Sequence, residues 1–221
     1  MSTRTIAIIG GTGAMGRGLA ERWARAGLDV VIGSRTADKA SGVADAIRAR
    51  VPEARVRGDA NAVAAEAADV VVLSVPFAQH EAILAELRPA LAGKVLVDLT
   101  APLRPPRVDV VTLPPGGSAA VRAQEILGAG VHVVSAFQNV SARHLSHEDE
   151  IECDVLVTGD DDAACEIVIE LARAAGLRAW RAGPLASSVA AESLAAVLIH
   201  INRRYKIAGA GVRITGGDDD G

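Results

Sequence analysis

Short apolar runs rich in Val and Ile alternate with longer stretches of helical periodicity through the first hundred residues. The runs are continuous rather than alternating, which is typical of strands buried on both faces of a parallel sheet. We predict strands at residues 5–9, 29–32, 54–57, 70–75 and 94–99. Helices are predicted between them, at residues 16–26, 37–50, 62–68 and 79–91. This alternation predicts the α/β class, with a doubly wound parallel sheet and right-handed crossovers.

The second half of the chain has a different pattern. Residues 100–117 contain five prolines and a Gly-Gly pair, which predicts a long ordered loop of the kind that is usually functional or mobile. Further elements are expected at 118–127 (helix), 131–135 and 153–158 (strands), 162–175 (helix), 178–181 (strand) and 189–202 (apolar helix). We expect a first domain over residues 1–150, a small C-terminal α/β domain over 151–215 and a disordered tail over 216–221.

Composition and charge narrow the possible classes of protein. Hydrophobic residues make up 50 % of the chain but aromatic residues only 2 %, so the core must be aliphatic. A net charge of −4 without a basic cluster argues against a nucleic-acid partner. We find no signal segment and no apolar run of about 18 residues, so we expect a soluble, cytoplasmic protein without a membrane partner. The apolar helix at 189–202 predicts a homodimer, because a small domain cannot bury all of its aliphatic surface.

No metal site is expected from the residue spacing. Cys153 and Cys165 form no CxxC motif, so we interpret them as small buried residues in a reducing compartment. The acidic run at 160–162 precedes a predicted helix, where carboxylates satisfy unpaired backbone amides. Among the histidines, His80 is expected near a bound ligand, and His200 is expected to be a satisfied core residue.

A glycine motif, Gly11-x-Gly13-x-x-Gly16, directly follows the first predicted strand and opens the first predicted helix. Gly11 permits a tight turn, Gly13 lets the backbone approach a pyrophosphate, and Gly16 allows close packing of helix on strand. The pyrophosphate would lie on the amides at the helix start, where the helix dipole favours an anion. The motif therefore predicts a Rossmann-type sheet that binds a dinucleotide.

The end of the second predicted strand indicates which dinucleotide binds. NAD-binding proteins place Asp or Glu there to bind the ribose 2′-hydroxyl, whereas this chain has Ser34 and Arg35. The Ser34 hydroxyl and the planar Arg35 guanidinium suit a phosphate, and Lys39 adds a cation one turn into the next helix. These residues predict NADP.

A second ligand is expected beyond the nicotinamide, because ligands of open α/β sheets lie outside the carboxyl ends of the strands. Val75, Pro76 and Phe77 would form a lip at the end of the fourth strand. The loop at 135–142 follows the sixth strand and offers neutral amides and hydroxyls, which are poor acid–base catalysts. The chain is therefore either a binding protein without chemistry or an enzyme that works by positioning, as in hydride transfer between two rings.

Several motifs together resemble the NADPH-dependent reductases of coenzyme F420, the F420-dependent NADP oxidoreductases. They are Gly10–Gly18, Gly33–Arg35 with Lys39, Val75–Phe77, Val134–Ser141, Gly159–Asp162, Ala182–Leu185 and Ile201–Ile214. The resemblance covers almost the whole chain. It implies a Rossmann domain, a small C-terminal domain, and a deazaflavin that lies over the nicotinamide in the cleft between them.

The resemblance also implies roles for individual residues. The residues that it assigns to the two coenzymes are Thr12, Gly13, Ala14 and Met15 for the pyrophosphate; Ser34, Arg35 and Lys39 for the 2′-phosphate; Phe77 and Ala142 for the nicotinamide half; and Gln138, Asn139 and Val140 for the deazaflavin. A hydride would pass directly between the rings, so no catalytic side chain is predicted.

Two other functions remain open from the sequence. One is an NADP-dependent reductase of another small substrate, which would need a proton donor near the nicotinamide. His80 and Asp98 are the candidates for that role. The other is a non-catalytic NADP-binding module, which would bind NADPH but reduce no acceptor.

Overall fold

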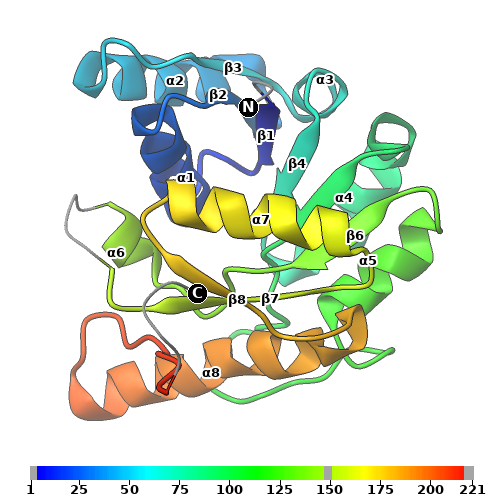
Figure 1. Ribbon diagram of the computed structural model, residues 1–221, viewed down its shortest axis with the longest axis vertical. Coiled ribbons are helices and arrows are strands. Elements are labelled where there is room, and N and C mark those ends of the chain that lie inside the picture. The colour runs from blue at the N-terminus through cyan, green and yellow to red at the C-terminus, as the bar shows by residue number, and fades with distance from the viewer. Residues whose placement is uncertain (1–3, 147–150, 217–221) are drawn as a thin grey trace.

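One eight-stranded sheet organises the protein in the computed structural model, which describes residues 4–146 and 151–216 (Figure 1). The strands are β1 (Thr5–Ile9), β2 (Asp29–Ser34), β3 (Val56–Ala60), β4 (Val70–Leu73), β5 (Val95–Asp98), β6 (His132–Ser135), β7 (Asp154–Gly159) and β8 (Arg178–Arg181). They are ordered β3-β2-β1-β4-β5-β6-β7-β8. The first six strands are parallel, β7 is antiparallel to β6, and β8 is parallel to β7.

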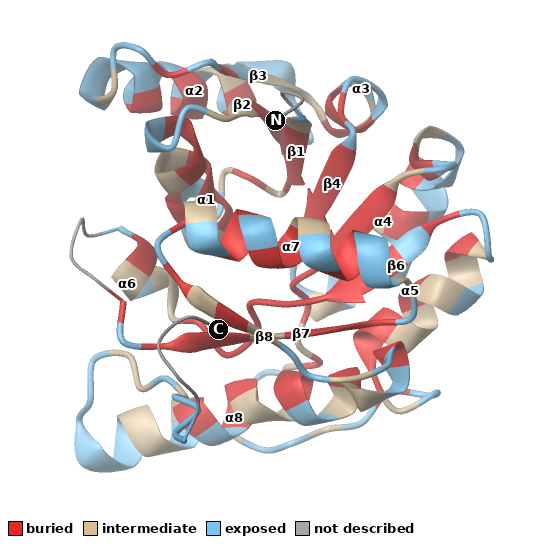
Figure 2. Ribbon diagram, viewed as in Figure 1, coloured by how far each residue is buried: buried red, intermediate tan, exposed pale blue. Residues whose placement is uncertain are grey.

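Helices cover both faces of the sheet. They are α1 (Ala14–Arg25), α2 (Ala37–Arg50), α3 (Asn61–Glu66), α4 (His80–Leu87), α5 (Ala119–Leu127), α6 (Ala142–Leu145), α7 (Asp162–Ala174) and α8 (Ser188–Tyr205). Successive strand residues point to opposite faces, so Ile8 belongs to a core cluster with residues of α1, α2 and α7, whereas Ala7 belongs to a second cluster with residues of α3, α4 and α5. Figure 2 shows the resulting buried strands between helices with exposed outer faces. The predicted α/β, doubly wound architecture is confirmed.

The C-terminal part continues this sheet. Helix α8 packs against α5 and β7 (Figure 1). After α8 the chain returns to β7, where the Asp154 amide donates to the Val212 carbonyl oxygen (2.8 Å) and the Ile214 amide donates to the Asp154 carboxylate (2.8 Å). The division into domains at residue 150 stays a prediction. The predicted tail lies outside the described residues, apart from Gly216.

The predicted elements exist, with shifted ends. The predicted fourth helix is interrupted, because α4 ends at Leu87 and Pro89 lies in a 3-10 turn, Arg88–Leu91. Two 3-10 turns, Phe77–Gln79 and Leu185–Ser187, were not predicted from the sequence. The helix-capping role of the acidic run is confirmed, since the Asp161 carboxylate accepts from the Ala164 amide (2.8 Å).

Two details of side-chain burial bear on the sequence predictions. Cys153 and Cys165 are free and buried, as expected. The prediction for His200 is wrong: its side chain is 64 % exposed, and its Nδ1 lies 3.7 Å from Asp109 Oδ2. His200 lies one turn from the exposed Val197, so this face of α8 points away from the core.

The segment Leu185–Tyr205 is long and apolar enough to cross a membrane, by length and composition alone. Of its apolar 18-residue stretch, 39 % is buried inside the protein. One face of α8 lines the cleft described below, and its Glu192 is buried against α5. We therefore interpret it as a helix that packs on the fold through one face, although the sequence was expected to contain no apolar segment of this length.

Candidate functional site

A cleft of about 610 Å³ lies at the carboxyl ends of β1, β4, β5 and β6, with α8 as its opposite wall. Its lining comes from five segments that are distant in sequence. They are Gly13–Met15, Ser74–Ala78, Leu99 with Ala101, Leu103, Pro105 and Val108, Gln138–Ser141, and Ala195, Leu198, Ile199, Asn202 and Ala210. The edge of the sheet is the one where open α/β proteins bind ligands. The structure thus brings the glycine loop, the lip after β4 and the loop after β6 into one cavity.

The glycine loop is shaped by close backbone packing. Gly10 has a φ of +76°, and a Cβ there would lie 2.4 Å from the Ser74 carbonyl oxygen. A Cβ at Gly16 would lie 2.8 Å from the Gly11 Cα in the loop and 3.2 Å from the Ile8 Cγ2 of β1, which agrees with the close approach of helix to strand that the motif predicts. At Gly13 the nearest neighbour of an added Cβ would be the Gly10 carbonyl oxygen, at 3.4 Å. Of these three positions only Gly13 therefore has room for a Cβ without a clash, and a pyrophosphate can approach its backbone closely.

The predicted 2′-phosphate residues lie at the end of β2, outside the cleft. Ser34 ends the strand and is 6 % exposed, whereas Arg35 and Lys39 are exposed at the start of α2. Gly11 and Gly33 join the two loops, since the Gly11 amide donates to the Gly33 carbonyl oxygen (3.1 Å). The sheet order places this site two strands from β4, so an extended dinucleotide would run from β2 across β1 to β4.

Beneath the lip lies a buried His–Asp pair. The His80 Nε2 is 2.6 Å from Asp98 Oδ2, and both side chains are fully buried. Burial lowers the pKa of His80, but the charge of Asp98 and its hydrogen bond outweigh this and raise it above the ordinary value. The His80 ring is also stacked against the Phe77 ring, with centroids 6.3 Å apart. His80 supports the lip from behind and does not reach the cavity.

The loop after β6 is held by the two amide side chains that were predicted to meet the second ligand. Gln138 Nε2 donates to the Asp98 carbonyl oxygen (2.8 Å) and the Ser135 hydroxyl (2.7 Å). Asn139 Nδ2 donates to the Asp154 carbonyl oxygen (2.6 Å). Their carbonyl oxygens are buried without a partner among the described residues. Both side chains therefore position the loop through their NH₂ groups.

A buried carboxylate connects the α8 wall to α5. Glu192 is 1 % exposed and accepts from the amides of Ala119 (2.7 Å) and Ala120 (3.0 Å) at the start of α5. The pKa of Glu192 is raised to about 7, mainly by burial and in addition by the charge of Asp98, while the two amide hydrogen bonds act to lower it. Glu192 thus anchors α8 at the N-terminus of α5, where a carboxylate is favoured by the helix dipole.

Sequence reasoning missed most of the α8 wall. The apolar helix was interpreted as a dimer surface, yet its residues at the helical spacing 195, 198, 199 and 202 line the cavity. The proline-rich segment was expected to be functional or mobile, and it lines the cavity through residues such as Leu103 and Val108. Ala142, by contrast, lies next to the lining residue Ser141 and begins α6.

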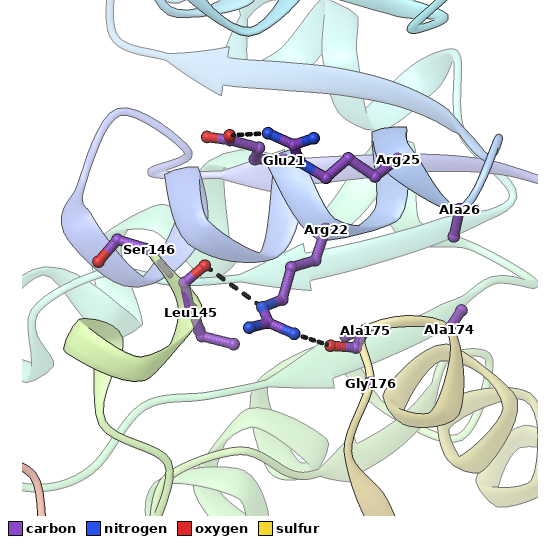
Figure 3. Close-up of a pocket in the computed structure, with 9 residues that line it drawn as sticks. All are labelled: Glu21, Arg22, Arg25, Ala26, Leu145, Ser146, Ala174, Ala175 and Gly176. Carbon is purple, nitrogen blue, oxygen red and sulfur yellow. Dashed lines mark hydrogen bonds and ion pairs between the residues drawn. The ribbon is translucent and has the colours of Figure 1, made fainter. Parts of the chain in front are cut away.

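A second pocket, of about 340 Å³, lies away from the glycine loop between α1, α6 and the end of α7 (Figure 3). Arg22 reaches across it and donates to the carbonyl oxygens of Ala175 (2.9 Å), Leu145 (3.3 Å) and His144 (3.3 Å). These bonds tie the first crossover helix to two later segments. We interpret Arg22 as a structural residue and not as part of the site.

The fold and the cleft define a Rossmann-type dinucleotide-binding protein with room for a second ligand beside the nicotinamide end. Residues 5–102 match the family described as NADP oxidoreductase coenzyme F420-dependent. The chain is 40 % identical to the F420-dependent NADP reductase of Methanothermobacter thermautotrophicus, over 95 % of this chain and 94 % of the relative. It is also 40 % identical to that of Methanocaldococcus jannaschii, over 95 % and 97 %. The chain therefore belongs to the family of F420-dependent NADP reductases.

Solved structures agree with this fold. A chain from Arthrobacter sp. FB24 that carries a provisional F420-dependent NADP reductase name has a TM-score of 0.80 and 28 % identity, covering 96 % of this chain and 99 % of its own. The Plasmodium falciparum pyrroline carboxylate reductase with NADP bound has a TM-score of 0.56 at 14 % identity, covering 82 % and 59 %. At that identity the second likeness concerns the fold alone.

Proposed function

We propose that this protein transfers a hydride between NADP(H) and coenzyme F420. The observation that carries the proposal is the single cleft in which a glycine loop, an aromatic lip and a loop of neutral side chains converge. When both coenzymes are bound, a hydride from the reduced ring of one is accepted by the oxidised ring of the other, and a proton balances the charge. The contribution of the protein is then alignment of two rings in a confined space.

The glycine loop fits a pyrophosphate, because a Cβ at Gly13 would meet only the Gly10 carbonyl oxygen, at 3.4 Å, and α1 begins directly after it. We assign Gly11, Thr12, Gly13, Ala14, Met15 and Gly16 to the pyrophosphate. Ser34, Arg35 and Lys39 would bind the 2′-phosphate, through one hydroxyl and two exposed cations at the start of α2. The charge pattern favours NADP over NAD.

The nicotinamide half would lie against Val75, Pro76 and Phe77, with Ala142 at its border. Phe77 is held from behind by the buried His80, so its ring can present a fixed apolar surface. The deazaflavin would lie against the segment Gln138–Val140, whose two amides fix the backbone of the loop. The apolar face of α8 would exclude water from the two rings.

The geometry disfavours reduction of a carbonyl substrate. The candidate proton donors for such a reaction, His80 and Asp98, are both fully buried and are bonded to each other. Neither lines the cleft among the residues that the structure describes. A reaction that takes its proton from solvent is therefore favoured.

The deciding assay is the loss of visible absorbance of oxidised coenzyme F420 on mixing with NADPH and the protein. We expect bleaching that depends on protein concentration and is much weaker with NADH. Tight NADPH binding with no bleaching at high protein concentration would instead favour a non-catalytic module.

We also propose that the protein is a cytoplasmic homodimer. Exposed apolar side chains support the dimer: Val197 of α8, and Val110, Val111 and Leu113 of the proline-rich loop. The Asp109–Arg203 ion pair (3.0 Å) holds that loop against α8, so these side chains can belong to one surface. Light scattering at micromolar concentration should give a dimer mass, and a monomer would contradict this. Fractionation of expressing cells tests the location.

A further inference from the structure

The α8 wall of the cleft is unusually rich in cations for an acidic protein. In the segments 99–117 and 193–216 the only carboxylate side chain is that of Asp109. The cations of the same segments are Arg104, Arg107, Arg203, Arg204, Lys206 and Arg213. The chain as a whole has a net charge of −4, so positive charge is concentrated in the two segments that form this wall.

Several of these cations lie beside residues that line the cavity. Arg104 lies between the lining residues Leu103 and Pro105, and its guanidinium carbon is 5.6 Å from the centre of the Phe77 ring. Lys206 is exposed and directly follows α8, four residues after the lining residue Asn202. Its φ of +58° is in the left-handed region.

The loop and the helix bring further cations together around Asp109. Arg203 forms an ion pair with the Asp109 carboxylate (3.0 Å). The pKa of Asp109 is lowered most by a backbone hydrogen bond within its own residue, and the charges of Arg203 and Arg107 lower it further. One carboxylate therefore faces two guanidinium groups. No carboxylate in residues 4–146 or 151–216 pairs with Arg104 or Lys206, so the positive charge there is not neutralised by that part of the chain.

This wall is separate from the site predicted for the 2′-phosphate of NADP. Arg35 and Lys39 follow β2, whereas Arg104 follows β5, and β1 and β4 lie between those strands. An NADP that ran from β2 to β4 would have its 2′-phosphate outside the cleft, at the end of β2, and its pyrophosphate at the glycine loop. The cations of the α8 wall would then lie beyond the nicotinamide, on the side that the second ligand occupies.

From this placement we infer that Arg104, Arg107, Arg203 and Lys206, together the cationic rim, bind the anionic side chain of the second coenzyme. Coenzyme F420 carries a phosphodiester and glutamate carboxylates on a chain attached to its deazaflavin ring. With the ring in the apolar cleft, that chain must leave through the mouth, and cations there attract it over distances of about 10 Å at ordinary salt. The inference rests on the proposed function and adds that the protein recognises the anionic side chain of the coenzyme as well as its ring.

The test compares coenzyme F420 with the deazaflavin riboside that has the same ring but neither phosphate nor glutamates. The wild-type protein should have a lower KM for the full coenzyme. In the triple variant Arg104→Gln, Arg107→Gln and Lys206→Gln, the KM for the riboside divided by the KM for F420 should fall about tenfold, because each exposed cation contributes a few-fold to the affinity for F420. Affinities from fluorescence titration should show the same loss, and a salt dependence that is steeper for F420 than for the riboside.

Arg204→Gln is the matched control. It removes the same charge from the same helix, but among the described residues Arg204 forms no ion pair with Asp109 and does not line the cavity. The control should keep the KM ratio of the wild type.

Equal affinity of the wild-type protein for F420 and the riboside would overturn the inference, as would a triple variant that loses affinity for NADPH instead of F420. Failure to reduce either deazaflavin would refute the proposed function. The binding titration would still decide whether the rim discriminates between the two compounds.

Discussion

The imidazole Nε2 of His80 lies 2.6 Å from Asp98 Oδ2, in a position where neither side chain contacts solvent. Asp98 also accepts from the Thr100 amide through Oδ1 (2.9 Å), and its backbone carbonyl accepts from Gln138. His80 in turn stacks on Phe77. One buried pair therefore joins three walls of the cleft: the lip after β4, the end of β5 and the loop after β6.

Substitution of Asp98 by Asn should destabilise the protein by about 3 kcal/mol, because the imidazole of His80 loses its charged partner in a buried site. The free energy of unfolding in urea measures this. Asp109→Asn, which removes a carboxylate from an exposed ion pair, should cost much less. A loss below about 1 kcal/mol in Asp98→Asn would show that the buried pair does not stabilise the fold.

Stability should fall as the pH rises from about 5 to 8. The folded protein holds the Glu192 proton up to about pH 7, whereas in the unfolded chain a glutamate releases it near its ordinary value of 4.5. The folded state thus binds more protons in this interval, and rising pH removes up to about 3 kcal/mol. The raised pKa of His80 acts in the same direction. The stabilisation that His80 gives the folded protein is complete below pH 6.5 and is lost as the pH rises through the pKa of His80 in the folded state.

The variant Glu192→Gln isolates the carboxyl contribution. A glutamine can accept through only one atom, so one of the two α5 amides loses its partner and the variant is less stable at pH 5 by about 1–3 kcal/mol. Its stability should change less between pH 5 and 8 than that of the wild type. Unfolding curves at several pH values test this, and identical slopes for both proteins would assign the pH dependence to other groups.

Arg35→Ala should raise the KM for NADPH about tenfold or more and change the KM for NADH little, because the lost guanidinium would contact only the 2′-phosphate. Steady-state kinetics with both cofactors measures the two effects. Equal losses for NADPH and NADH would contradict the assignment of Arg35.

Two glycines of the cradle should respond differently to alanine. Gly13→Ala should leave stability nearly unchanged but weaken NADPH binding, since its Cβ would meet only the Gly10 carbonyl at 3.4 Å and would occupy ligand space. Gly10→Ala should be less stable by about 2 kcal/mol or more, because the left-handed φ is strained and the Cβ would collide with the Ser74 carbonyl. Thermal unfolding and NADPH titration separate the two effects. A strongly destabilised Gly13→Ala would contradict this contrast.

Arg22→Gln should destabilise the protein by about 2 kcal/mol, because three partly buried carbonyl oxygens lose a charged donor. Figure 3 shows two of these bonds, to Leu145 and Ala175. The KM for NADPH should not change, since the Arg22 pocket is separate from the glycine loop. Arg25→Gln provides a neighbouring control, for which a smaller change is expected because the Arg25–Glu21 pair is exposed.

The sequence by itself determined the sheet and the cofactor end of the site. Buried strands and a glycine motif are local patterns. Runs of Val and Ile are stable inside a parallel sheet that is covered on both faces, and the spacing of Gly11, Gly13 and Gly16 reflects contacts within one strand–turn–helix unit. The predicted lip at Phe77 and the loop at Gln138 follow from the same rule, because the carboxyl ends of parallel strands meet at one edge.

Tertiary structure decided what faces that edge. The periodicity of α8 predicted an apolar helix but could not state whether Leu198 would meet a partner subunit or a cleft, nor that His200 would face solvent. The burial of His80, the inward turn of the Gln138 amide and the anchoring of Glu192 at α5 all depend on contacts between segments far apart in the chain. Long-range contacts of this kind leave no periodic trace in the sequence, because each partner is selected by the packing of the complete fold.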